Sequence, residues 1–312
     1  MIDLFDYLYY LTVSLPPFFK KYRIDSIIRV AIRYIVNFYF PIYYKLTANN
    51  LKHSIKCANC EDVIVSLTTF PSRINNVWLT IESVMRQKRK PKKIILWLSI
   101  LQFPSYEELP KRLLALQKRG LEIILCDDDL KSHKKYYYTV KEYQKSTFIT
   151  IDDDVFYNSF FLKTLLNIHR KHPNSIVCNH CCSISVDEKV ILPYLSWENI
   201  YHYTCYDKSI MPIGMGGVLY PPHSLYKGVL DTIAIKQFCL TADDIWLNVM
   251  SRLNHTNIIC TGLESLYLPV RNKNNKTLSS INCSGANDIQ LDMVREYCIN
   301  TYNRDPYCEL FE

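Results

Sequence analysis

The sequence predicts an α/β fold, in which helices flank a mostly parallel, Rossmann-like sheet behind an N-terminal helical extension. Between residues 62 and 151, short apolar runs alternate with amphipathic segments, and only short links separate them. Polar or acidic residues directly follow the apolar runs. Since the carboxyl ends of parallel strands share one edge of a sheet, these residues should meet there and form one site.

The individual elements follow from the spacing of the apolar residues. Val77, Ile81 and Val84 lie on one face of a helix, and Gly120 stands where a helix would end. The predicted elements in chain order are strand 62–67, helix 77–86, strand 92–98, helix 107–118, strand 121–126, helix 134–145, strand 148–151, helix 159–172, strand 175–178, a glycine-rich loop and strand at 214–222, and helix 241–253. Residues 270–312 are polar and only weakly patterned.

The bulk composition is that of a globular protein and excludes some classes. Of the 312 residues 48% are hydrophobic and 21% charged, so a disordered chain is not expected. Glycine is scarce, with 7 residues, and neither the P-loop nor the dinucleotide fingerprint is present. The basic runs are not part of a DNA- or RNA-binding motif, so we expect no nucleic-acid partner.

We expect an N-terminal extension (1–60), a catalytic domain (61–290, with halves 61–155 and 156–290) and a C-terminal tail (291–312). Residues 1–45 are rich in Tyr, Phe, Lys and Arg, and residues 1–60 carry most of the net charge of +7. No apolar run reaches the roughly 18–20 residues that span a bilayer, and no secretory signal is expected. Residues 1–45 therefore favour contact with a membrane interface, and the alternative is a helical extension packed on the domain.

The chain has 12 cysteines. Cys126 and Cys178 fall in predicted core strands, so we expect free thiols in a reducing cytosol. The Cys57–Cys60 pair has the spacing of half a zinc site, but we recognise no second pair at zinc spacing after it. The adjacent Cys181 and Cys182 are expected to be packing residues.

The most informative segment is the strand that ends in Asp152, Asp153 and Asp154. Carboxylates this close repel one another, and each raises the pKa of its neighbours. A bound divalent cation would keep them ionised, and oxygen ligands suit Mg²⁺ or Mn²⁺. The pattern predicts a metal site with an anionic ligand such as a diphosphate, and the alternative is a solvated turn.

Five sequence features occur in an order that resembles the nucleotide-sugar glycosyltransferases of the GT-A fold. They are Thr-Thr-Phe-Pro-x-Arg at 68–73, the acidic loop 127–129, the aspartates 152–154, Gly-Gly-Val-Leu-Tyr-Pro-Pro at 216–222, and Asp-Asp-Ile-Trp at 243–246. The resemblance covers residues 60–290 and is greatest to bacterial cell-surface polysaccharide transferases of the family 2 type. It implies a Rossmann-like sandwich that binds a nucleoside diphosphate-sugar through Mn²⁺ or Mg²⁺.

The resemblance also implies roles for individual residues. Asp154 and Asp152 would bind the metal, and Asp244 would be the catalytic base, assisted by Asp243. The nucleotide would be bound by Thr68, Thr69, Phe70, Pro71, Arg73, one of Asp127, Asp128 and Asp129, Lys134 or Lys135, and the aspartates Asp152 and Asp153. The acceptor would meet Gly216, Gly217, Tyr220, Pro221 and Trp246. A third metal ligand is missing from the late sequence, unless His255 or the Asn287-Asp288 pair serves.

The function expected from these features is metal-dependent transfer of a sugar from a nucleoside diphosphate-sugar, most simply a UDP-sugar, to a glycan or lipid-linked acceptor. Inversion with Asp244 as base is favoured, in the cytoplasm or on the inner face of a membrane. One alternative is a nucleotidyltransferase of similar fold, against which the absence of glycine from the first loop counts. Another is a membrane-associated scaffold without turnover.

Overall fold

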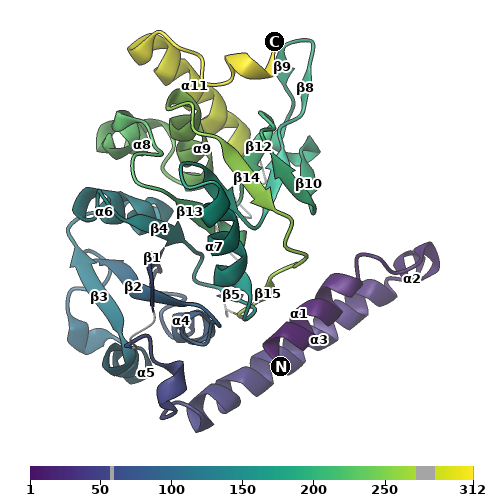
Figure 1. Cartoon of the computed structure of the whole chain (residues 1–312), viewed down its shortest axis with the longest axis vertical. Helices are drawn as coiled ribbons and strands as arrows, with labels where there is room; N and C mark the ends of the chain where they lie inside the picture. The colour runs from purple at the N-terminus through teal and green to yellow at the C-terminus, as the bar shows by residue number, and fades with distance from the viewer. Residues whose placement is uncertain (57–59, 272–284, 312) are drawn as a thin grey trace.

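The computed structural model describes residues 1–56, 60–271 and 285–311, and its centre is one large sheet (Figure 1). The sheet has eight strands in the order β11-β14-β6-β13-β4-β1-β2-β3. In that order, their bounds are Tyr203–Cys205, Ile258–Thr261, Ile176–Cys178, Val218–Tyr220, Thr147–Thr150, Cys60–Thr68, Lys90–Ser99 and Leu121–Cys126.

Most strands of this sheet are parallel. β3, β2, β1 and β4 pair in parallel, and β14 pairs in parallel with β6. β13 lies between β4 and β6 and is antiparallel to both, and β11 is antiparallel to β14 at the edge. The predicted α/β class, with a mostly parallel sheet flanked by helices, is confirmed.

Helices cover both faces of the sheet because the strand side chains alternate in direction. Along β1, Val63, Val65 and Leu67 belong to one hydrophobic cluster, whereas Ile64 belongs to the other. The first cluster includes residues of α3 (Ile24–Leu46), α4 (Val77–Met85), α5 (Lys111–Ala115) and α7 (Phe161–Lys171). The second includes residues of α6 (Lys134–Glu142), α8 (Thr232–Phe238), α9 (Asp243–Leu253) and α11 (Asn287–Tyr302).

Short strands outside this sheet shape the loops around its edge. β10 (Glu198–Ile200), β7 (Cys181–Ser183) and β12 (Ile210–Pro212) form a three-stranded antiparallel sheet. β15 (Leu268–Pro269) pairs with β5 (Val155–Phe156), directly after the predicted metal-binding aspartates, and β8 (Val186–Asp187) pairs with β9 (Val190–Ile191).

Two predicted segments differ from the structure. The helix expected at 107–118 is three short pieces, because Pro110 precedes α5 and 3-10 turns flank it at Tyr106–Glu108 and Leu116–Arg119. Proline lacks an amide hydrogen and disfavours a helical residue before it. The tail that we expected to be weakly patterned contains α11, a helix of 16 residues, and the predicted boundary at 290/291 falls inside it.

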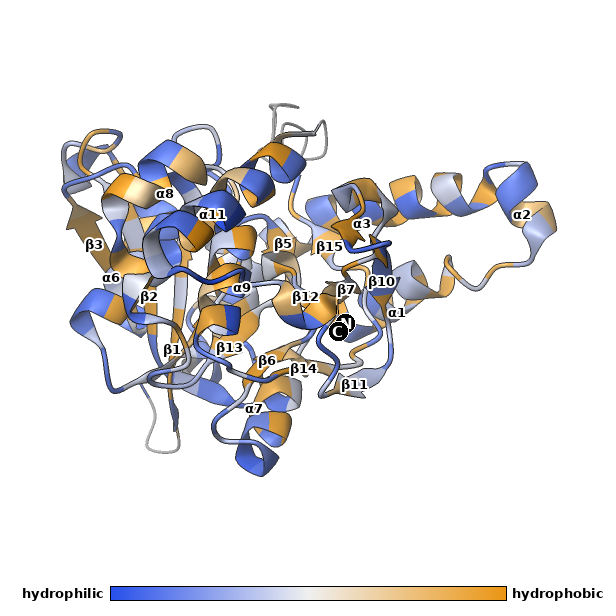
Figure 2. Cartoon of the chain, turned by 90° about the horizontal axis from the view of Figure 1, so that it is seen from above, coloured by the Kyte–Doolittle hydropathy of each residue, from blue (hydrophilic) through white to orange (hydrophobic). Residues whose placement is uncertain are grey.

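The N-terminal extension is helical and projects from the domain (Figures 1 and 2). It contains α1 (Ile2–Leu11), α2 (Pro17–Lys21) and α3. Asp6 is buried and accepts hydrogen bonds from Asn158 Nδ2 (2.8 Å) and Ser265 Oγ (2.7 Å), and Asp3 accepts one from Ser159 Oγ (2.7 Å). Within the described ranges, no helix has both the length and the apolar character needed to cross a bilayer.

A buried histidine connects α6 to the segment before α9. His133 is fully buried, its Nε2 lies 2.7 Å from the Cys239 carbonyl oxygen and its Nδ1 lies 2.8 Å from the Tyr136 hydroxyl. A carbonyl only accepts, so Nε2 carries the proton and Nδ1 accepts from the tyrosine. Burial lowers the pKa of His133 to about 4, since it penalises the charged imidazolium.

We predict that this histidine makes stability depend on pH. Between pH 6.5 and 4 the unfolded chain binds a proton that the folded chain rejects, so the unfolding free energy falls as the pH is lowered, by about 2 kcal/mol at pH 5 from this group. Urea unfolding at pH 7.5 and pH 5 measures the difference. His133→Asn should reduce it, whereas His202→Asn, at an exposed position, should not. An unchanged pH dependence in His133→Asn would contradict the assignment.

Candidate active site

A cavity of about 600 Å³ lies at the carboxyl edge of the parallel strands, against the start of α9. The loops after β1, β3 and β4 reach it, as expected for an open α/β sheet. The predicted site residues that line it are Thr68, Thr69, Phe70, Arg73, Asp129, Lys134, Lys135, Asp152, Asp153, Asp154, Asp243 and Asp244. Pro71, Asp127, Asp128, Gly216, Gly217, Tyr220 and Trp246 are not among its lining residues.

The backbone of the acidic loop after β4 is fixed on several sides. Ile151 N donates to Ser66 O (3.1 Å), and Val270 N donates to Asp154 O (2.7 Å). The buried Thr80 hydroxyl donates to Asp153 O (2.9 Å). Because neighbouring segments hold these backbone groups, the three carboxylates have defined directions.

Those directions separate the middle aspartate from the outer two. Asp153 is buried and accepts hydrogen bonds from Thr69 Oγ1 and from Arg73 Nη1 (2.5 Å). The side chains of Asp152 and Asp154 are 34% and 29% exposed, respectively, and both residues line the cavity. Arg73 Nη1 also lies 2.9 Å from Asp154 Oδ2, so Asp153 positions the arginine beside the outer carboxylates.

A buried lysine joins this loop to α9. Lys135 Nζ lies 2.8 Å from Asp152 Oδ1 and 2.9 Å from Asp243 Oδ2, and only 3% of the residue is exposed. The two carboxylates, together with Asp244, hold the pKa of Lys135 well above its usual value against the effect of burial. The ammonium group is therefore charged and shared between two parts of the chain.

The second aspartate of α9 faces the cavity in a different environment. Asp244 Oδ2 accepts a hydrogen bond from Gly214 N (3.0 Å). Burial, followed by the charge of Asp243, raises the pKa of Asp244 to about 7. In contrast, Lys135 and His133 hold the pKa of Asp243 below its usual value although burial opposes them. A carboxyl group with a pKa near neutrality is suited to accept a proton.

The outer carboxylates fit a divalent cation. Burial, and then the charge of Asp153, raises the pKa of Asp154 to about 7, so a second positive charge is needed to keep this carboxylate ionised near neutral pH. Asp152 and Asp154 offer hard oxygen ligands on one side of a partly open cavity. These residues would hold the Mn²⁺ or Mg²⁺ that the sequence predicted.

In the loop after β3, one of the three predicted aspartates faces the cavity. Asp129 accepts hydrogen bonds from Lys131 Nζ (2.6 Å), Gln102 Nε2 (2.9 Å) and Lys134 Nζ. Asp128 instead pairs with Lys236. Asp129 therefore positions two lysines at the cavity, and its carboxylate oxygens already accept hydrogen bonds from protein side chains.

Gly214, which borders the cavity, and Gln102, which lines it, were not predicted from the sequence. Gly214 lies between the charged groups, since a Cβ built there would be 2.8 Å from Asp244 Oδ1 and 3.1 Å from Lys135 Nζ. Gln102 and Asn287 line the cavity, and their buried side-chain oxygens have no hydrogen-bond partner within the described part of the chain. The glycine-rich run was a signal for Gly214, and Asn287 was already named as part of a possible ligand pair, whereas nothing in the sequence distinguished Gln102.

The predicted acceptor wall is wrong. Trp246 is fully buried and donates from Nε1 to Val229 O (3.0 Å), and Tyr220 is buried and stacks on Phe148 at 5.1 Å. A Cβ at Gly216 would meet His180, and one at Gly217 would meet Phe161, so these glycines allow close packing within the protein.

His255 does not reach the acidic loop. It contacts Arg304 and Glu309 just beyond the end of α9, whereas Asp243 and Asp244 begin that helix. A helix of 11 residues is roughly 16 Å long. The two residues of the Asn287-Asp288 pair have different surroundings. Asn287 lines the cavity, whereas Asp288 does not line it and accepts a hydrogen bond at Oδ1 from Tyr194 N (2.6 Å).

Comparisons with known proteins give matches among solved structures. No protein-family profile and no curated protein match the chain. The 4-diphosphocytidyl-2C-methyl-D-erythritol synthase of Anaerococcus prevotii shares 14% identity over 66% of this chain and 92% of its own, with a TM-score of 0.40. The inositol-1-phosphate CTP transferase of T. maritima shares 10% identity over 72% and 96%, with a TM-score of 0.39. HddC of Yersinia pseudotuberculosis shares 15% over 52% and 76%, with a TM-score of 0.34.

This finding corrects the expected activity. None of these three structures, which are some of the matches, is named a glycosyltransferase, and one is named a CTP transferase. The prediction of sugar transfer from a UDP-sugar to a glycan or lipid-linked acceptor is contradicted by these comparisons and is wrong. What the resemblance anticipated correctly is the α/β architecture, which the sheet of this chain shows.

We predict that Gly214→Ala destabilises the protein by about 1–3 kcal/mol, because the new methyl group would overlap the half-buried Asp244 carboxylate. Urea unfolding of a double-mutant cycle with Asp244→Ala measures this. The cost of the Gly214 substitution should fall when the carboxylate is absent. Equal costs in both backgrounds would show that the two side chains do not compete for space.

Proposed function

We propose that this protein is a metal-dependent nucleotidyltransferase. The observation that supports the proposal is the juxtaposition, in one cavity, of the outward-facing carboxylates Asp152 and Asp154 with the cationic side chains of Arg73, Lys131 and Lys135. Carboxylates that hold a divalent cation, beside fixed cations, form the arrangement that polyphosphate chemistry requires.

In the proposed reaction, an acceptor oxygen attacks the α-phosphorus of a nucleoside triphosphate. A new P–O bond forms, the bond to the β-phosphate oxygen breaks, and pyrophosphate leaves with the bonding electrons. A divalent cation bound by Asp152 and Asp154 would neutralise the charge of the phosphates. Where the acceptor is a hydroxyl group, Asp244 Oδ1 would take its proton, since Oδ2 is already bonded to Gly214 N.

Fixed positive groups would bind the rest of the phosphate chain. Arg73 is held by Asp153 at the edge of the acidic loop, and Lys131 and Lys134 are held by Asp129 on the opposite loop. Guanidinium and ammonium groups fixed by ion pairs bind phosphate without losing side-chain freedom at that moment. The side-chain amides of Gln102 and Asn287 would pair with polar groups of the base or ribose.

We predict that the protein releases pyrophosphate from a nucleoside triphosphate in the presence of Mg²⁺ or Mn²⁺, and that EDTA abolishes release. A coupled pyrophosphate assay over the common nucleoside triphosphates, with pooled sugar phosphates and alcohols as acceptors, measures this. Asp154→Asn should lower the rate by about 10²-fold or more, as losing a charge that acts on the phosphates does.

Asp127→Asn is the matched control, because this aspartate is exposed and does not line the cavity. It should keep the full rate. A wild-type protein that releases no pyrophosphate from any triphosphate would overturn the proposal, and so would equal rates in the two variants.

We further propose that the N-terminal helices lie on an anionic membrane surface. α3 packs on the protein through one face, which includes the buried Val36, Phe40 and Tyr44. Its opposite face is also apolar, with Phe38 75% and Ile27 65% exposed. A helix that is apolar on both faces needs a second apolar environment.

The charges of the extension favour a lipid surface over an apolar protein partner. Asp3 and Asp6 are turned toward the domain by their hydrogen bonds. The exposed residues Lys20, Lys21 and Arg23 lie in the connection between α1 and α3, which includes α2. Basic residues beside exposed aromatic and aliphatic side chains bind the interface of anionic bilayers.

We predict that the protein co-sediments with phosphatidylserine vesicles and less with phosphatidylcholine vesicles. The pair Tyr34→Asp and Phe38→Asp should prevent sedimentation, because charges are placed where the acyl boundary would be. The pair Leu195→Asp and Ile233→Asp is the control, as these apolar residues are 72% and 76% exposed outside the extension. Equal sedimentation of both variants would contradict the proposed surface.

A further inference from the structure

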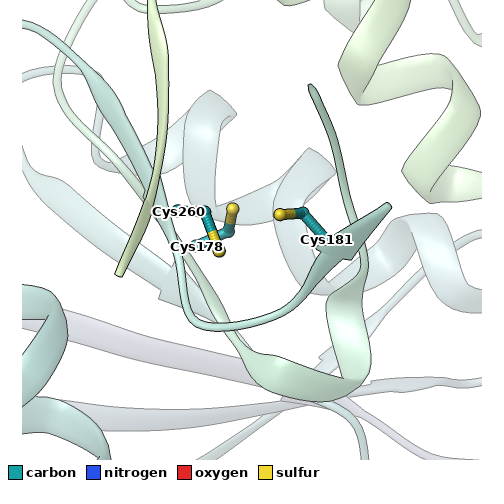
Figure 3. Close-up of side chains that lie close together, drawn as sticks. All are labelled: Cys178, Cys181 and Cys260. Atoms are coloured by element: carbon teal, nitrogen blue, oxygen red, sulfur yellow. The ribbon is translucent and has the colours of Figure 1, made fainter. Parts of the chain in front are cut away.

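Three cysteines meet away from the candidate active site. The Sγ atoms of Cys178, Cys181 and Cys260 all lie within 4.8 Å of one another, and all three residues are buried (Figure 3). Each comes from a different strand, namely the ends of β6 and β14 and the start of β7. Cys178, Cys181 and Cys260 are all free thiols.

The fold itself brings these sulfur atoms together. Cys178 and Cys260 are direct partners on the neighbouring parallel strands β6 and β14, so their side chains lie on the same face of the sheet. The chain then turns through two residues and returns Cys181 over that face as part of the three-stranded sheet. Cys178 and Cys181 form a Cys-x-x-Cys pair, which was not predicted from the sequence.

We propose that Cys178, Cys181 and Cys260 bind a zinc ion as three thiolates. The three thiols would release their protons to solvent as the metal binds. Zinc–sulfur bonds are about 2.3 Å long, so sulfur atoms around one zinc are roughly 4 Å apart, which is compatible with the observed cluster. A Cys-x-x-Cys pair is a usual element of zinc sites, and with three protein ligands a water molecule would take the fourth tetrahedral position.

The position of the cluster gives the metal a structural role. Ile213 N donates to His180 O (3.0 Å), and Asn179 N donates to Gly217 O (3.3 Å). The turn between the two cysteines therefore holds both ends of the glycine-rich loop 214–216, and Gly214 in that loop binds Asp244. A zinc ion at this point would join β6, β7 and β14 and fix the loop that borders the candidate active site.

Cobalt provides a direct readout, because thiolate ligation of Co²⁺ produces a sulfur-to-metal charge-transfer band that carboxylate ligation cannot produce. The full-length protein, reduced and freed of metal, should bind one equivalent of Co²⁺ with this band, and Zn²⁺ should displace it. Mutating a residue that only contacts the ligands of a zinc site lowers metal affinity by about tenfold or more. Cys260→Ser removes a ligand itself and should therefore weaken binding by more than about tenfold. Cys182→Ser is the control, since Cys182 is also buried but lies outside the cluster.

The outcomes are decisive in either direction. Absence of the band in the reduced wild-type protein would overturn the proposal, as would equal loss of the band in Cys260→Ser and Cys182→Ser. A disulfide between Cys178 and Cys181 in protein purified under reducing conditions, detected by mass spectrometry, would also overturn it. If Cys260→Ser does not fold, the zinc content of the wild-type protein, one equivalent or none by elemental analysis, decides the question.

Discussion

The candidate site depends on one buried ammonium group. Lys135 Nζ is shared by Asp152, which follows β4, and Asp243, which begins α9, and these residues are 91 positions apart in the sequence. Removing the charge would leave two carboxylates facing one another in a place with little water, at a cost of several kcal/mol. The ion pair therefore fixes the distance between the acidic loop and the helix that carries Asp244.

Around this contact, the aspartates have different tasks because their surroundings differ. Asp153 and Asp129 are occupied by Arg73 and by lysines and act as supports. Asp154 and Asp244 lack a cation that fully compensates burial, so the pKa of each is raised. Some carboxylates of the site are neutralised by ion pairs, whereas the ionised forms of Asp154 and Asp244 are electrostatically unfavourable. Such a site is suited to bind an additional positive charge.

Particular elements show how far the sequence reaches. β1 and β2 could be predicted because a short continuous apolar run, typical of a strand buried on both faces, is a property of the local sequence. The helix at 107–118 failed because Pro110 was ignored, although its missing amide hydrogen is also a local property. α11 was missed because the apolar periodicity of the tail is weak, and its helix is stabilised by packing on α8 and α9.

The sequence by itself determined the α/β class and the acidic edge of the sheet. The reason is that the apolar runs, and the residues that directly follow them, are properties of the local sequence. Only the tertiary structure decided which carboxylates face the cavity, that Tyr220 and Trp246 are core residues, and that Cys260 lies beside Cys178 and Cys181. The physical reason is that burial, pKa and ligand geometry depend on neighbours brought in from remote segments, and no local pattern encodes their distances.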